Sequence, residues 1–173
     1  MNSGRVEFDG DLDRQRRILG MAGHALGMVR RQDHDGLLAE LADFVGLSPD
    51  GRADLTTLIC VLVHECAAMV GTFAGTVSAG EPIKVQALDG EAQPVPIDAL
   101  DPPVRTMMRI MLAAGYGDPV AAEEQLELAL REAGVHELIQ LFSLGLTWTV
   151  QLAQECSRRG IAIVEWARPA VEG

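Results

Sequence analysis

The sequence predicts an all-α fold: a bundle of about six helices with a small β-hairpin inserted near residues 83–97. First, 48% of the 173 residues are hydrophobic, which is enough to build a core and argues against disorder. Second, apolar residues recur at helical spacing over long runs, and proline, glycine and capping residues separate these runs. Because only 4% of the residues are aromatic, we expect a core made mainly of aliphatic side chains and methionine.

The chain is predicted to begin with a flexible segment over residues 1–10, followed by a single helical domain over residues 11–173. The first helix is expected from about Leu12 to Arg31. Glycine lowers helix propensity, so three glycines on one side of this helix predict a groove that another backbone approaches closely. These residues are Gly20, Gly23 and Gly27.

The second helix is expected from His34 to Val45, with Gly46 as its C-terminal stop. A turn then leads into a long apolar helix that ends near Val77. Asp54 is predicted to be its N-cap, because aspartate accepts hydrogen bonds from the free N–H groups of a first turn.

Beyond the hairpin, three further helices are expected. Asp101 and Asp118 are each followed by proline, a combination typical of helix starts, and the last long helix should run from about His136 to Arg159. The β-prone segment Ile161–Trp166 is expected either to pair with the hairpin or to dock on the bundle. An offset of 83 residues superposes two leucine pairs of the long helices, which either an internal repeat or ordinary bundle geometry explains.

His64 and Glu65 stand side by side in the middle of the first long apolar helix. On a helical wheel both fall within its least apolar wedge, as expected for a core helix with one polar edge. A membrane span is the rival interpretation. The central glutamate argues against it, because ionised groups are costly in a bilayer.

The two long helices each carry a strip of mostly uncharged polar side chains. Such groups tolerate partial burial because they hydrogen-bond without ionic desolvation. The strips are therefore expected to meet each other, a second copy of the chain, or a water-filled pocket. The candidate pocket or interface residues are Thr57, Cys60, His64, Glu65, Gln140, Ser143, Thr147 and Gln151.

The sequence predicts no catalytic residues, no cofactor and no metal site. Cys60 and His64 are four residues apart, but two ligands do not make a zinc site. The zinc-protease pattern that begins at His64 fails because Ala68 occupies the position of the second histidine. A phosphate-binding loop, a dinucleotide fingerprint and a serine nucleophile elbow are absent from the sequence.

Charge and cysteine usage indicate an acidic cytoplasmic protein. The net charge of −11 disfavours nucleic acid as a partner. Arg5, Arg14, Arg16, Arg17, Arg30 and Arg31 are interpreted as a solvated face balanced by nearby aspartates. The start of the sequence lacks an apolar signal region, and we expect the three cysteines to be reduced and buried.

These observations favour a non-catalytic, cytoplasmic helical-bundle protein. It would act through homo-oligomerisation, such as a homodimer, or through binding of a partner helix, as a regulatory or scaffold subunit. One alternative is a small-molecule binder or sensor with a pocket between the long helices. Another is a metal-dependent enzyme that uses His64 and its neighbours.

Overall fold

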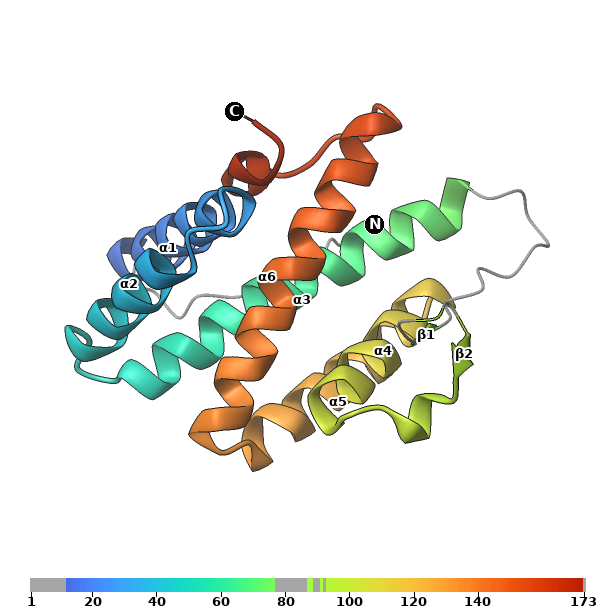
Figure 1. Cartoon of the computed structure of the whole chain (residues 1–173), viewed down its shortest axis with the longest axis horizontal. Coiled ribbons are helices and arrows are strands. Elements are labelled where there is room, and N and C mark those ends of the chain that lie inside the picture. The colour runs from blue at the N-terminus through green and yellow to red at the C-terminus, as the bar shows by residue number, and fades with distance from the viewer. Residues whose placement is uncertain (1–11, 77–86, 89–90, 92, 173) are drawn as a thin grey trace. The chain divides into compact units, whose positions relative to one another are not determined.

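The computed structural model describes residues 12–76, 87–88, 91 and 93–172, and within these ranges the chain is all-α (Figure 1). The six predicted helices are present. Their bounds are α1 Leu12–Arg30, α2 His34–Gly46, α3 Gly51–Thr76, α4 Pro102–Gly115, α5 Pro119–Glu132 and α6 Val135–Arg158. Two short 3-10 helices accompany them, η1 Ile97–Ala99 and η2 Glu165–Ala170.

The predicted hairpin is present in a minimal form. Strand β1, Ala87–Leu88, pairs antiparallel with β2, Pro94–Val95, so that Ala87 lies opposite Val95 and Leu88 opposite Pro94. The predicted flexible segment, residues 1–10, lies outside the described residues.

The chain divides into two compact units, and the long helices α3 and α6 contribute to both. One unit comprises Met1–Cys66 and Gly145–Gly173, and the other comprises Ala67–Leu144. The single domain expected over residues 11–173 stays a prediction. Each unit is described by itself below.

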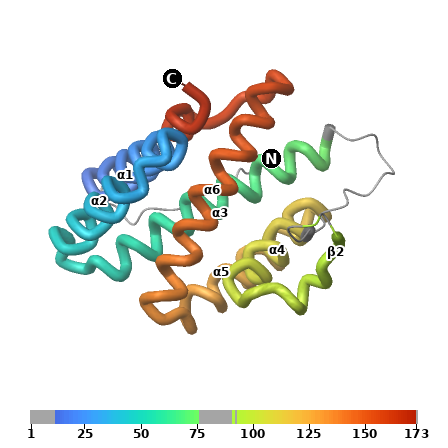
Figure 2. The backbone as a smooth tube through the Cα atoms, in the orientation of Figure 1, coloured from blue at the N-terminus to red at the C-terminus, as the bar shows by residue number. Residues whose placement is uncertain are grey.

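In the first unit, α1 and α2 pack together and the N-terminal part of α3 crosses the C-terminal part of α6 (Figure 2). Gly145 allows this close crossing, because a Cβ atom there would lie 3.2 Å from the Cβ of Leu62. Beside it, the buried thiol of Cys66 lies 3.2 Å from Oγ1 of Thr149, whose hydroxyl donates to the carbonyl of Gly145 at 2.6 Å. A neutral hydrogen-bonded pair thus satisfies the polar atoms at the centre of the crossing.

The glycine side of α1 receives the C-terminal segment, as the glycine spacing predicted. A Cβ atom on Gly23 would lie 2.7 Å from the backbone carbonyl oxygen of Trp166, and one on Gly27 would lie 3.6 Å from the Cβ of Pro169. Gly20 has nothing within 4 Å, so the groove involves only the other two glycines. Residues 161–166 therefore do not form a strand; they lead into η2, which docks on α1.

In the second unit, α4 packs directly on α5. Asp118 caps α5 as predicted, since its side chain accepts a hydrogen bond from the backbone N–H of Ala121. Asp101 occupies the N-cap position of α4, but its side chain makes no capping hydrogen bond. Pro102 at the first helical position lacks an N–H, so this end has one donor fewer to satisfy.

Candidate functional site

The candidate residues on α3 are all partly buried. None of the four side chains, Thr57, Cys60, His64 and Glu65, is fully buried or fully exposed. The hydroxyl of Thr57 donates to the carbonyl of Ala53 at 2.8 Å and accepts from Nη2 of Arg14 at 3.3 Å. The first member of this strip therefore meets an arginine of α1, a partner that the sequence interpretation did not include.

Burial around Glu65 affects three titratable groups. Desolvation raises the pKa of Glu65 above its ordinary value. Burial also raises the pKa of the Cys66 thiol to about 12, although the hydrogen bond between Cys66 and Thr149 acts in the opposite direction, and burial raises the pKa of Cys156. Because the thiolate is the nucleophile and the metal ligand, these two cysteines are unreactive structural groups. All three cysteines are free, although Cys60 is only partly buried.

The candidate residues on α6 are exposed. Gln140, Ser143, Thr147 and Gln151 all lie on the accessible side of the helix. A polar side chain of α6 that contacts α3 is that of the fully buried Thr149, which the sequence interpretation did not select. The polar strip on α3 is therefore half-buried, whereas the polar strip on α6 is exposed to solvent.

Asp54 is not the N-cap of α3, contrary to the prediction. The helix begins at Gly51, and the carboxylate of Asp50 accepts a hydrogen bond from the backbone N–H of Ala53 at 3.1 Å. Asp50 therefore does the capping, because it stands three residues before that N–H, in the position that N-cap side chains serve. Asp54 lies one turn inside the helix and is only 1% exposed.

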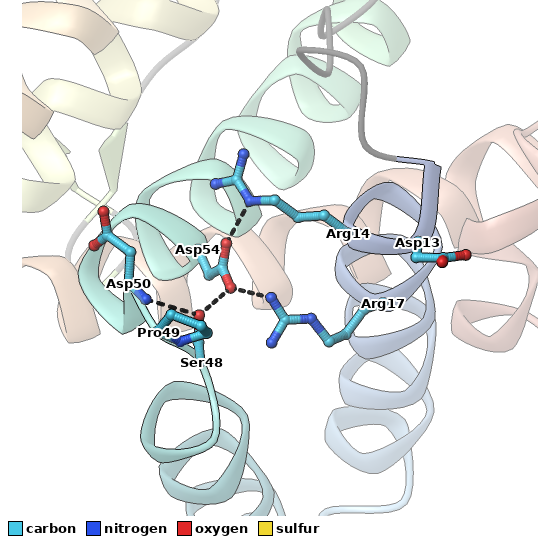
Figure 3. Close-up of a pocket in the computed structure, with 7 residues that line it drawn as sticks. All are labelled: Asp13, Arg14, Arg17, Ser48, Pro49, Asp50 and Asp54. Atoms are coloured by element: carbon cyan, nitrogen blue, oxygen red, sulfur yellow. Dashed lines mark hydrogen bonds and ion pairs between the residues drawn. The ribbon is translucent and has the colours of Figure 1, made fainter.

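The buried carboxylate of Asp54 is held by three donors. It accepts hydrogen bonds from Nε of Arg14 at 2.6 Å, from the hydroxyl of Ser48 at 2.5 Å, and from Nη2 of Arg17 (Figure 3). Burial by itself would raise the pKa of Asp54. The hydrogen bonds from Ser48 and Arg14 and the charges of both arginines outweigh it, so the pKa is lowered and the group is ionised at neutral pH.

The interpretation of the N-terminal arginines as one solvated face is wrong for two of them. Arg14 and Arg17 form ion pairs with Asp54 across 40 and 37 residues of sequence. Arg16, which pairs with the exposed Asp13, behaves as that interpretation expected. The guanidinium of Arg17 also lies over the ring of Phe44, 5.4 Å from its centroid.

These residues line a cavity of about 420 Å³, which we name the Arg–Asp54 cavity. Its lining residues are Asp13, Arg14, Arg17, Ser48, Pro49, Asp50 and Asp54. The sequence contained two signals for this cavity. Arg14 and Arg17 are three residues apart on α1, and Asp54 lies next to Leu55 at the edge of the apolar face of α3. Helix periodicity does not say which residues of separate helices meet, so the pairing was missed.

Within the described ranges, no group of three or more histidine, cysteine or acidic residues could hold a metal ion. In the same ranges, residues Gly51–Gly75 are long and apolar enough to cross a membrane, a test that core helices of soluble proteins also pass. Comparisons with family models, curated proteins and solved structures found no match to this chain.

Proposed function

We propose that the chain is a non-catalytic cytoplasmic protein that self-associates through the exposed side of α6 and serves as a regulatory or scaffold subunit. We name this surface the α6 face. It consists of Gln140, Ser143, Thr147, Gln151 and Gln154.

The observation that supports this proposal is the absence of charge on the α6 face. From Ile139 to Gln154, every exposed side chain of α6 is uncharged. This stretch of one continuous helix is about 22 Å long at 1.5 Å per residue. The exposed side of α5 is different, because most of its side chains are charged: Glu124, Glu127, Arg131 and Glu132.

A second copy of the chain is the partner that best fits this face. Two chains of charge −11 repel each other, so they approach most favourably where neither exposes a charge. Glutamine, serine and threonine side chains contain both donors and acceptors, so a face built from them is complementary to itself. Self-complementarity is what a two-fold symmetric interface requires.

The charges that flank the α6 face favour an antiparallel arrangement centred near Thr147. Glu137 lies ten residues before Thr147, and Arg158 lies eleven residues after it. In two antiparallel helices related by a two-fold axis at Thr147, Glu137 of each copy would lie opposite Arg158 of the other. A parallel arrangement would place like charges together at both ends, which costs free energy.

Disulfide trapping tests the contact and its direction. We expect Thr147→Cys, at the axis, to form a covalent dimer under mild oxidation. Gln140→Cys alone should not, whereas Gln140→Cys combined with Gln154→Cys should. Ala42→Cys, on the exposed side of α2, is the matched control for random collisions. Equal trapping at positions 147 and 42 would contradict the interface, and trapping by Gln140→Cys alone would contradict its direction.

The oligomeric state gives an independent measurement. Sedimentation velocity over a range of concentrations should show a monomer–dimer equilibrium for the natural chain. Thr147→Glu should raise the dissociation constant at least tenfold, because it places two carboxylates together at the axis. Ala42→Glu changes the net charge equally and should leave the dissociation constant nearly unchanged. A strict monomer at the highest concentration would overturn the proposal.

A further inference from the structure

We propose that the Arg–Asp54 cavity binds the oxyanion, carboxylate or phosphate, of a small molecule, with Arg17 as the principal contact. This inference is independent of self-association, because it concerns α1 and the start of α3 rather than the α6 face. It extends the small-molecule alternative to a place that the sequence interpretation did not select.

Arg17 is held in place and still has donors to offer. Its Nη2 donates to Asp54 and its guanidinium plane lies over Phe44, so two different contacts fix its orientation. Within the described part of the chain these are its only polar or ring partners, although a guanidinium carries five N–H donors. In Figure 3 its other terminal nitrogen lies on the side of the Ser48–Pro49 turn, which also lines the cavity. The side chain is 39% exposed, so a ligand can reach it.

The inner part of the cavity carries a positive charge. Arg14 and Arg17 contribute two positive charges, and Asp54 contributes one negative charge. The other two acidic lining residues add negative charge: Asp13 is paired with Arg16, whereas Asp50 keeps its charge and accepts a hydrogen bond from the backbone N–H of Ala53. Figure 3 shows both of these carboxylates directed away from the two guanidinium groups. A monovalent oxyanion would balance the remaining positive charge of Arg14, Arg17 and Asp54 with short, charge-assisted hydrogen bonds.

Asp54 acts here as a positioning residue. Its carboxylate is buried behind the two arginines and saturated by three donors, so it orients the guanidinium groups without competing further for them. A planar guanidinium held in this way presents the paired N–H groups that match a carboxylate or phosphate. Arginine recognition of oxyanions depends on this geometry as well as on charge.

The volume indicates a small organic anion rather than a bare ion. A cavity of about 420 Å³ lies within the range of ligand pockets, roughly 300 to 1,000 Å³. The overall charge of −11 does not exclude an anion, because charges more than about 8 Å away are largely screened at physiological salt.

Titration with simple anions at constant ionic strength tests the site. The probes are inorganic phosphate and acetate, added against chloride, and the readout is the Nε–Hε resonance of Arg17 in a ¹⁵N-correlated NMR spectrum. We expect a saturable shift with at least one probe. Arg17→Gln should weaken that binding at least tenfold, measured by calorimetry, and Arg17→Lys should weaken it too because the planar fork is lost.

Arg131→Gln is the matched control, because it removes the same charge from an exposed residue of α5 that does not line the cavity. It should keep binding within about twofold of the natural chain. Equal losses in both variants would show general electrostatic attraction and overturn the site. Circular dichroism monitors folding. If Arg17→Gln unfolds, Arg17→Lys and the resonance shift in the natural chain decide the question, and the absence of a saturable shift overturns the proposal.

Discussion

The three helices before the hairpin and the three after it each end in a long helix, α3 or α6, yet within the described residues only the first set has a buried charged cluster. An offset of 83 residues places Gly51, the start of α3, on Gly134, one residue before α6 begins. The same offset places Asp54 on Glu137. Asp54 is buried between two arginines, whereas Glu137 is exposed and accepts a hydrogen bond from the backbone N–H of Gly134 at 2.8 Å. A long third helix therefore forms without a buried charged cluster, which is a separate feature of α1 and α3.

The contacts of the first helix in each set differ as well. In the second set, α4 packs on the helix that follows it, α5. In the first set, α1 packs less on α2 than on η2, which comes from the far end of the chain. At the crossing of α3 with α6, however, the contacting pairs Leu62–Gly145 and Cys66–Thr149 are themselves 83 residues apart. The internal repeat stays a prediction, because two helices that cross in the same direction keep one offset at successive contacts.

The largest expected effect separates Asp54 from its counterpart Glu137. Asp54→Ala leaves two partly buried arginines without their carboxylate and should lower the free energy of unfolding by about 3 kcal/mol. Glu137→Ala removes one exposed helix-terminal hydrogen bond and should cost about 1 kcal/mol or less. Urea denaturation followed by circular dichroism measures both. Similar losses for the two variants would mean that the cluster adds no special stability to the first set.

The next largest effect tests the packing of η2 on α1. Gly23→Ala would place a methyl group against the carbonyl oxygen of Trp166, and we expect a loss of about 2 kcal/mol or release of η2. Gly20→Ala is the matched control on the same helix, and with nothing within 4 Å it should stabilise the chain by about 0.5 to 1 kcal/mol. Thermal unfolding reports the change in stability, and tryptophan fluorescence in a Trp148→Phe background, where Trp166 is the remaining tryptophan, reports release of η2. A stabilising Gly23→Ala would show that η2 does not dock in solution.

These cases show what the sequence could predict. Helix positions followed from apolar periodicity and from turn residues such as Gly46 and Pro102, because both signals are local. The groove on α1 was also predictable. Glycine lowers the stability of a helix, so several glycines on one side indicate that another backbone packs closely there. Which backbone fills the groove was not predicted; residues 161–166, expected either to pair with the hairpin or to dock on the bundle, lead into η2, which packs on α1.

The candidate site was less predictable because it depends on contacts between distant segments. A wheel placed Asp54 and Thr57 on a polar edge of α3, but only the packing of α1 brings Arg14 to them. Thr149, two residues after the exposed Thr147 and about 200° from it on a wheel, lies on the opposite, buried side of α6, and only the packing of α3 brings Cys66 to its hydroxyl. Residue type was a poor guide there, because a threonine suits either environment when its hydroxyl is paired.

The smallest expected effect compares how pH changes the stabilities that two shielded acidic residues of α3, Asp54 and Glu65, confer on the folded chain. Asp54 stabilises the folded chain when ionised. Its contribution is present above its ordinary pKa of 3.8 and is lost as the pH falls through its lower folded-state pKa. Glu65 behaves in the opposite way. Its folded-state pKa is raised by desolvation, so the folded chain loses stability as the pH rises above about 4.5 toward that higher pKa.

Glu65→Gln should therefore raise the stability at pH 7 by up to about 1 kcal/mol, with a smaller gain at pH 4.5. Cys66 and Cys156 lie near Glu65 and stay protonated over this range, because burial raises the pKa of both thiols. Unfolding in urea at a series of pH values gives the difference between the variant and the natural chain. Glu124→Gln, on the exposed side of α5, makes the same change in net charge and serves as the control. A gain for Glu65→Gln that is independent of pH would assign the effect to packing and would remove desolvation as the cause.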